Sequence, residues 1–362
     1  MLIAPSFSFL PNDRTRVNVD FVYSKAKSRL DRGQPIFGGS AGTQLNSTPI
    51  SFAIAKQNDF MHELNMNSTL SIQHKFSDHV SINASYMKVL YDEDLLEHRT
   101  SNNYAVDEAG QEIPTLMQMQ TIRRKRKSFN DNISLYLVNR FKTGPLEHRM
   151  TAGYDYIQNV VPIGGSTFNA AGYRNADNTR VVSRYNKDKP ELYLIEDGMP
   201  VPNVPHFDLT DPDYSISEIS SYINDPNSQS AARTFQHGIF FQDQIAWGPV
   251  KAVLALRQGY YTNVRDYKQD DENLVRQRKF IPRIGLVYTP IQPVSIYANY
   301  TQGYQPQSAN IVADPERYGG PFEPMTSKSF EGGVKTEFFN KLLAINTAIY
   351  HIEKNNILID AN

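Results

Sequence analysis

Cysteine is absent from the 362 residues of this chain, which excludes a disulfide framework and any metal site built on thiolates. Long apolar runs are also missing, since nowhere do about 18 consecutive apolar residues occur, as a transmembrane helix requires. Residues 1–10 show no basic segment followed by an apolar one, so we predict no signal peptide there. The formal net charge of −1 lacks the basic excess of nucleic-acid-binding proteins, and we expect no nucleic-acid partner.

Patterns typical of metal sites and catalytic centres are missing too. The eight histidines are scattered without a His-x-x-x-His pair, which argues against zinc. Asp92-Glu93-Asp94, with Glu97 and His98, offers oxygen ligands for a hard metal ion, but such a charge run is more often a solvated rim. The segment Gly38 to Thr43 lacks the lysine of a phosphate-binding loop. Because no nucleophile is paired with a base, we predict no catalytic residue, no metal, no cofactor and no enzymatic activity.

Aromatic residues, in contrast, are abundant. The chain has 21 tyrosines and 19 phenylalanines, although its mean hydropathy is only −0.49. The core of a water-soluble protein rarely needs so many rings in so polar a chain. A β-barrel in a membrane does need them, because aromatic side chains gather at both membrane–water interfaces.

The clearest local pattern lies at residues 326–356, which we interpret as two strands joined by a turn at Phe338 to Lys341. Along the first strand, apolar and polar residues alternate with period two, as in a strand with one apolar and one polar face. The apolar positions are Phe330, Val334 and Phe338, and the polar ones are Glu331, Lys335 and Glu337. Within this strand, Gly332-Gly333 predicts a bulge or a close backbone approach.

The same unit recurs along the chain as a long strand, a tight turn, a second long strand and then a much longer loop. We expect short turns at residues 11–14, 77–79, 143–145, 248–249 and 289–290, and long loops at 27–59, 92–125, 161–232 and 303–325. The pattern predicts about twelve strands. Short turns at one end and long loops at the other are typical of membrane barrels. The predicted fold class is therefore all-β, an antiparallel transmembrane β-barrel.

Aromatic residues on the apolar faces of these strands form two rows, which we predict to be membrane-interface aromatics. The row beside the short turns consists of Phe9, Phe76, Phe141, Trp247, Tyr288 and Phe338. The row toward the long loops consists of Tyr23, Tyr86, Tyr154, Tyr260 and Tyr300. Two such rows bracketing an apolar band indicate two membrane–water interfaces. A soluble β-propeller also has many aromatic strands, but its blade repeats of about 40 to 50 residues are not found.

Several stretches of these strands resemble a known family. The most specific is Ser295 to Pro306, preceded by Phe240 to Gln244 and by Arg283 to Tyr288. Shorter matches occur at residues 4–6 with 11–15, 31–35, 329–335, 349–350 and 355–356. Their order and spacing together resemble the TonB-dependent outer-membrane receptors, and among them the ferric-siderophore receptors. The resemblance covers the strands throughout but hardly any loop.

This resemblance implies a barrel of about 22 strands closed by an N-terminal plug domain. Residues 1–362 are then expected to be a partial barrel domain, from about the third to the fourteenth strand, with the plug and the closing strands absent. The implied function is uptake of an Fe(III)-siderophore across the bacterial outer membrane, energised by the TonB–ExbB–ExbD complex. The implied assembly is a monomer surrounded by outer-membrane lipid and lipopolysaccharide. Alternatives are a receptor for cobalamin, another metal chelate or an oligosaccharide, and a passive or adhesive barrel.

Candidate ligand-binding residues follow from strand parity and from loop composition. In the run Arg123 to Lys127, parity with Phe129 turns Arg124 and Arg126 toward the lumen, where cations would attract an anionic chelate. The other three cations would face outward, toward lipopolysaccharide phosphates, although a solvated rim explains such charges equally well. Loop aromatics and one further cation complete the candidate set, namely Tyr104, Tyr173, Arg174, Tyr185, Tyr304 and Tyr318.

Overall fold

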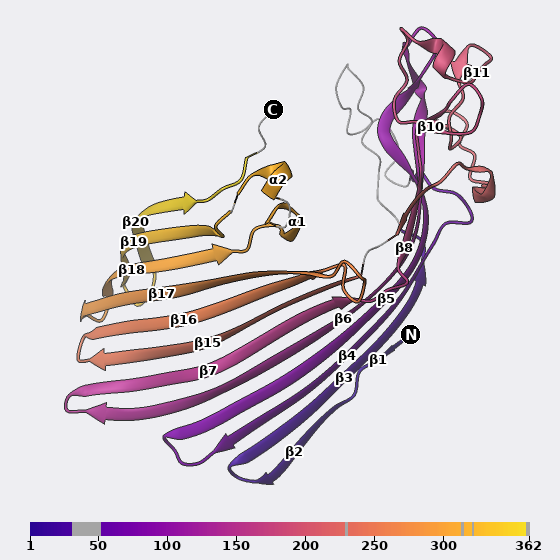
Figure 1. Ribbon diagram of the computed structural model, residues 1–362. Helices are drawn as coiled ribbons and strands as arrows, with labels where there is room; N and C mark the ends of the chain where they lie inside the picture. The colour runs from indigo at the N-terminus through magenta and orange to yellow at the C-terminus, as the bar shows by residue number, and fades with distance from the viewer. Residues whose placement is uncertain (31–51, 229–230, 313–314, 321, 360–362) are drawn as a thin grey trace.

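The computed structural model describes residues 1–30, 52–228, 231–312, 315–320 and 322–359 (Figure 1). Two segments singled out above, Gly38 to Thr43 and residues 31–35, lie outside the described residues. Within the described residues, no helix has both the length and the apolar character needed to cross a membrane.

One curved antiparallel sheet makes up most of the molecule (Figure 1). Its strand order is β1-β3-β4-β5-β6-β7-β15-β16-β17-β18-β19-β20, with β2 also paired to β3. The strands are β1 Leu2–Ile3, β2 Ser6–Asn12, β3 Thr15–Ser28, β4 Phe60–Lys75, β5 Val80–Val106, β6 Glu112–Thr143, β7 Leu146–Val161, β15 Ala232–Trp247, β16 Val250–Arg265, β17 Asn273–Ile291, β18 Val294–Gln305, β19 Met325–Phe338 and β20 Leu343–Asn355. The predicted antiparallel sheet of about twelve strands is confirmed, with each strand next to its neighbour in sequence.

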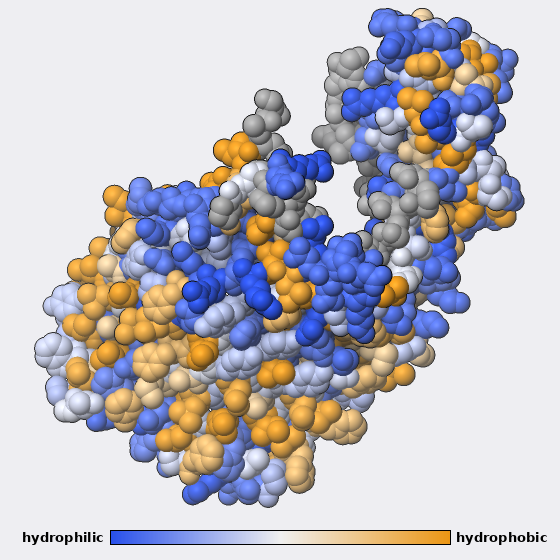
Figure 2. All heavy atoms as spheres, viewed as in Figure 1, coloured by the Kyte–Doolittle hydropathy of each residue, from blue (hydrophilic) through white to orange (hydrophobic). Residues whose placement is uncertain are grey.

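Cross-strand register divides the side chains of this sheet into two faces. Directly opposed residues share a face, and the residues on either side of them point the other way. Leu135, Tyr154 and Ile239 are linked in this way across β6, β7 and β15, and all three side chains are exposed. We call this side the apolar face and the opposite side the polar face. Figure 2 shows apolar side chains spread over the strands of the sheet.

Most of the proposed interface aromatics are exposed on the apolar face. The exposed fractions beside the short turns are 64% for Phe9, 54% for Phe76 and 59% for Trp247. In the row toward the long loops, Tyr86, Tyr154 and Tyr260 are likewise exposed, whereas Tyr23 and Tyr300 are half-buried. Rings left in solvent would cost free energy, so this distribution fits a lipid-facing surface. Their arrangement in two membrane interfaces stays a prediction.

The predicted loop at 92–125 is wrong. The strands β5 and β6 continue through it, from Val80 to Val106 and from Glu112 to Thr143. The acidic run 92–94 lies opposite the basic run 125–127 in the ladder, so complementary charge prolongs the hairpin where the apolar alternation ends. The predicted turn at 289–290 is also misplaced, because β17 runs on to Ile291 and the turn lies at residues 292–293.

The prolonged β5–β6 hairpin carries a lobe formed with residues 161–228, which stands away from the rest of the sheet (Figure 1). The lobe contains β8 Ser166–Ala170, β9 Tyr173–Arg174, β10 Val181–Val182, η1 Pro190–Leu192, β11 Ile195–Glu196, β12 Met199–Pro200, β13 Phe207–Asp208, η2 Ile219–Ser221 and β14 Asp225–Ser228. Its core is formed by Met117, Met119, Val204, Phe207 and Tyr222, all nearly inaccessible to solvent. Two short helices, α1 Ala309–Val312 and α2 Pro315–Tyr318, lie in the loop between β18 and β19.

The close approach predicted at Gly332-Gly333 is confirmed at Gly333. A Cβ atom there would lie 2.7 Å from the ring of Tyr297 on β18 and 2.6 Å from the carbonyl oxygen of Thr347 on β20. The Tyr297 hydroxyl donates to Glu331 at 2.5 Å, and the Lys335 ammonium lies 5.1 Å from the centre of the ring. The glycine thus lets a tyrosine lie flat on the polar face of β19.

Candidate ligand-binding wall and rim

Arg124 and Arg126 lie on the polar face near the lobe, where both contact the same carboxylate. Arg124 Nε donates to Glu93 at 2.5 Å, and the guanidinium of Arg126 lies 3.6 Å from the other carboxylate oxygen. Tyr91 donates to Glu93 at 2.5 Å, and its ring lies beneath the Arg126 guanidinium. We call these four residues the rim cluster. Tyr91 also donates to Glu63 at 3.0 Å, and Glu63 lies opposite Glu93 in the ladder, so the two cations lie beside two carboxyl groups.

Hydrogen bonding controls ionisation in the rim cluster. Burial opposes the charged form of Glu93, but the hydrogen bonds from Arg124 and Tyr91 outweigh it and lower the pKa of this carboxyl below its usual value. Burial, together with the acceptors Glu93 and Glu63, raises the pKa of the Tyr91 hydroxyl. The lowered pKa of Glu93 and the raised pKa of Tyr91 therefore keep this carboxyl ionised and this phenol neutral at neutral pH.

The other three cations of the run belong to the opposite face of β6. Arg123 pairs with Asp94 and lies over the ring of Phe60, while Lys127 lies 3.3 Å from Asp92. Lys125 is opposite Asp94 in the ladder. Of the acidic residues in the possible metal site, Asp92 and Asp94 form ion pairs with the basic run on the outward face and Glu93 on the polar face, whereas Glu97 pairs with Arg99. Within the described residues no cluster of three potential metal ligands occurs.

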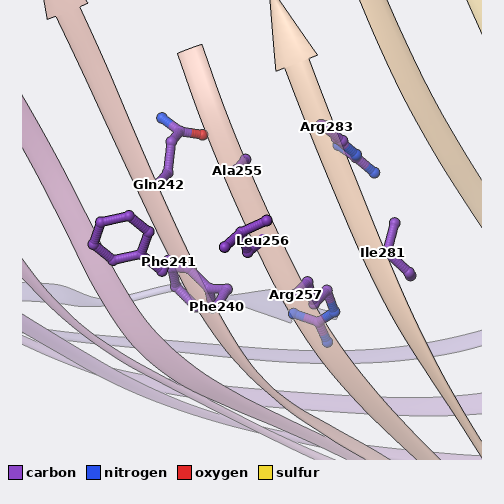
Figure 3. Close-up of a pocket in the computed structure, with 8 residues that line it drawn as sticks. All are labelled: Phe240, Phe241, Gln242, Ala255, Leu256, Arg257, Ile281 and Arg283. Atoms are coloured by element: carbon purple, nitrogen blue, oxygen red, sulfur yellow. The ribbon is translucent and has the colours of Figure 1, made fainter.

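A pocket of about 390 Å³ lies on the polar face at mid-height of β15, β16 and β17, and we call it the mid-wall pocket (Figure 3). Its polar-face lining comprises Phe240, Gln242, Ala255, Arg257, Ile281 and Arg283. Arg283 lies opposite Ala255 and Thr301 in the ladder, so small neighbours leave its guanidinium accessible. Among the described residues it has no ion-pair partner.

Arg257 is held differently, by a bidentate ion pair across a neighbouring strand. Its guanidinium passes over Gly238 of β15 and donates two hydrogen bonds to Asp155 of β7, one of them 2.7 Å long. A Cβ atom on Gly238 would lie only 2.6 Å from that guanidinium. Gly153 similarly makes room for Phe240, whose ring would lie 2.6 Å from a Cβ atom there. Both glycines therefore shape the pocket.

The candidate loop residues do not form a single surface. Tyr173 and Tyr185 belong to the lobe, with ring centres 6.1 Å apart, and burial raises the pKa of Tyr173 to about 12. Arg174 donates to Asn178 and to the carbonyl of Ser221, also in the lobe. Tyr104 packs against the lobe core. Tyr304 and Tyr318 lie instead on β18 and at the end of α2.

Four polar residues connect three segments inside the lobe through contacts that the sequence does not predict. Asp59, just before β4, accepts from His98 Nδ1 at 2.6 Å, and His98 Nε2 lies 3.2 Å from the Tyr222 hydroxyl. That hydroxyl also contacts the hydroxyl of Ser217. His98 is fully buried. The partners are separated by up to 124 positions, so no local pattern in the sequence predicts the contact.

Comparison with known proteins shows which family this chain resembles. Residues 5–362 match the family model described as TonB dependent receptor-like, beta-barrel. The metal-pseudopaline receptor CntO of Pseudomonas aeruginosa is 23% identical, covering 99% of this chain and 45% of that protein. The probable TonB-dependent siderophore receptor PiuA of Acinetobacter baumannii is 20% identical, covering 98% and 47%. The chain thus spans about half the length of these relatives.

Solved structures agree on the fold. The siderophore receptor PiuA from A. baumannii superposes with a TM-score of 0.65 at 17% identity, over 96% of this chain and 49% of that one. The ferric-catecholate import receptor Fiu from Escherichia coli K12 gives 0.66 at 14% identity, over 98% and 51%. The polar face is therefore the inner wall of a bacterial outer-membrane barrel, in a family of receptors rather than enzymes. This chain belongs to the TonB-dependent receptor family, as a stretch of its β-barrel domain.

Proposed function

We propose that this chain is the ligand-facing wall of a receptor that imports an anionic metal chelate of the siderophore type, energised by TonB. The observation that carries the proposal is the charge of the inner wall. On the inner faces of β15, β16 and β17 the Asp, Glu, Lys and Arg side chains are all cations, and the one carboxylate of these three strands, Asp243, lies on the outward face. These cations are Lys251, Arg257, Arg265, Lys279 and Arg283.

An inner wall of one charge sign attracts ligands of the other, because a cavity with low-dielectric walls concentrates the field. Chelates with carboxylate, hydroxamate or catecholate oxygens fit guanidinium groups, which donate two parallel hydrogen bonds. The similar proteins named above include a metal-pseudopaline receptor and a ferric-catecholate import receptor. The ligand of this receptor is accordingly expected among metal chelates, with Fe(III) as the metal.

In this proposal the rim cluster provides the first contact and the mid-wall pocket the second. Arg124 and Arg126 both contact Glu93, and their partly exposed guanidiniums would offer further donors to a ligand oxyanion. Arg283 offers a guanidinium without a protein anion among the described residues, in the pocket that Phe240 lines from β15, two strands away. The lobe residues Tyr173, Arg174 and Tyr185, with Tyr104, Tyr304 and Tyr318, remain candidates for contacts at entry.

The test is uptake of radiolabelled iron by cells producing the complete receptor, supplied with anionic or neutral ferric chelates. Uptake of the anionic chelate is expected to require TonB and to fall about tenfold or more in Arg283→Glu, since a lost charged hydrogen bond costs about 1.5–3 kcal/mol. Arg276→Glu, on the outward face of β17, is the matched control. Undiminished uptake in a host without TonB would refute the proposal.

A further inference from the structure

The inner wall at the long-loop ends of β4, β5 and β6 carries both charge signs, unlike the wall at β15 to β17. Glu63 of β4 lies directly opposite Glu93 of β5, and Glu93 lies opposite Arg126 of β6, so all three side chains share the inner face. Glu93 is 2% exposed and is held by Arg124 and Arg126. Glu63 is half-buried, and in the part of the chain that the structure describes it has no ion-pair partner. Of these two carboxylates, Glu63 is therefore the one that a ligand can reach.

The Tyr91 hydroxyl joins the two carboxylates but cannot fully satisfy both. It donates to Glu93 at 2.5 Å and to Glu63 at 3.0 Å, yet a phenol has a single hydrogen, so the two carboxylates share one donor. Glu93 also accepts from Arg124. For the Glu63 side chain, this shared hydrogen is the one donor among the described residues. A half-buried carboxylate with so few donors gains free energy when a further donor binds to it.

Groups that bind anions and a group that binds cations thus lie side by side at this rim. Arg124 and Arg126 present partly exposed guanidiniums from β6, and Glu63 presents its carboxylate from β4, two strands away. Two strand spacings correspond to about 10 Å. A guanidinium binds an oxyanion with two parallel hydrogen bonds, whereas a carboxylate binds an ammonium group. A ligand that contacts both sides carries both charges within that distance.

We propose that the chelate taken by this receptor carries a protonated amine, which Glu63 binds while Arg124 and Arg126 bind its oxyanions. The inference rests on the proposed function and specifies its ligand class, namely an anionic metal chelate that also bears an ammonium group. The ligand ammonium gives Glu63 a donor of its own, and the Tyr91 hydrogen is then left to Glu93. A free metal cation is the competing occupant, but among the described residues no cluster of three potential metal ligands exists to hold one.

The experiment measures binding of two chelates of radiolabelled iron to outer-membrane vesicles that contain the complete receptor, at one fixed salt concentration and without an energy source. Both probes are ferric trihydroxamates that end in a lysine with a free carboxylate. The lysine ε-amine is free in one probe and acetylated in the other, so the two differ in one positive charge. Wild type is expected to bind the probe with the free amine at least about tenfold more tightly, because it forms a charged hydrogen bond with Glu63.

Substitutions of Glu63 separate its charge from its place in the wall. Glu63→Gln is expected to lose the preference, by weaker binding of the free amine and with the affinity for the acetylated probe unchanged to within about twofold. Glu63→Asp keeps the charge and should keep most of the preference. The matched control is Glu353→Gln, which removes an exposed carboxylate from the outward face of β20 and should leave the preference intact.

The inference is wrong if wild type binds the two probes equally, or if it shows no saturable binding of the probe with the free amine. An equal loss of both probes in Glu63→Gln would show that this side chain shapes the wall and does not receive an ammonium group. Loss of the preference on addition of calcium chloride would assign Glu63 to a metal cation. The comparison of two probes on wild type requires no variant, so it stands even where a substitution prevents assembly. Vesicle binding needs no TonB, whereas iron uptake by cells does, so failure of this inference and failure of the proposed function are distinguishable.

Discussion

Gly238 is the residue on which the inner wall most directly depends for its shape. The Arg257 guanidinium occupies the space that a side chain would fill at this position, on its way to Asp155. In Gly238→Ala the added methyl group and the guanidinium cannot both fit, so the ion pair is expected to break. Because the clash is with the far end of a flexible side chain, which can move aside, the expected cost is that of the lost charged hydrogen bonds, about 1.5–3 kcal/mol. The measurement is the urea midpoint of the chain in detergent micelles.

Gly259 supplies the control for that substitution, because it lies opposite Gly238 on the next strand. A Cβ atom at Gly259 would meet nothing closer than 3.8 Å. Gly259→Ala is therefore expected to be neutral, or slightly stabilising through the lower entropy of the unfolded chain. A similar fall in the urea midpoint of both variants would show that the backbone freedom of glycine, and not the space it leaves for the Arg257 side chain, determines stability at this position.

A second prediction for a single residue is that the stability of the lobe depends on pH through His206. Burial lowers its pKa to about 4, from 6.5 in an unfolded chain. Between these values the unfolded state binds a proton that the folded state does not, so stability is complete above about pH 6.5 and is lost as pH falls toward 4. The full effect is about 3 kcal/mol. Limited proteolysis of the lobe across this range is expected to accelerate, and His206→Phe to abolish much of the acceleration.

At the scale of elements, the β5–β6 hairpin beyond the apolar band depends on opposite charges in register. Glu93 is 2% exposed and is the shared anion of Arg124 and Arg126. Glu93→Gln leaves two guanidiniums facing each other without it, and we expect the hairpin to open more easily by about 1.5–3 kcal/mol. Hydrogen exchange of the amides around Arg124 measures this opening.

Glu337→Gln is the comparison for this prediction, because that carboxylate is 58% exposed and lies 3.8 Å from Lys341. Exposed pairs of this kind are worth about 0–1 kcal/mol. If Glu93→Gln accelerates amide hydrogen exchange no more than Glu337→Gln does, the rim cluster does not keep the hairpin closed.

The same hairpin shows how far the sequence can be used for prediction. Within the apolar band, alternation with period two identified the strands and the face of each residue, because lipid and lumen select opposite side chains. Above the band the lipid no longer selects one apolar face, and apolar residues such as Leu95, Leu96 and Met117 are buried within the protein instead. The regular alternation therefore disappears, and residues 92–125 resemble a loop. The remaining signal was the antiparallel match between Asp92 to Asp94 and Lys125 to Lys127. The contact of His98 with Tyr222 has no such signal, since long-range loop packing leaves no period.

At the scale of the whole molecule, the sheet is open. In the described residues β20 and the pair β1 and β2 lie at opposite ends of the strand order and do not pair with each other. Unpaired edges are not tolerated in lipid, and about twelve strands make only part of a wall of this curvature. We therefore expect the 362-residue chain to form no uniform channel. Planar-bilayer recordings with a single reproducible conductance would contradict this.

The register of the β5–β6 hairpin also limits how the lobe can diverge among related receptors. An insertion in β5 between residues 92 and 99 displaces every charge above it unless β6 gains the same number of residues opposite. An odd number inserted between Asp92 and Glu93 would also turn Glu93 away from Arg124 and Arg126, because side chains alternate between faces. Length changes are easier beyond Thr100, where the register already shifts. The hairpin should thus lengthen or shorten in matched, even steps below that point, while its tip varies freely.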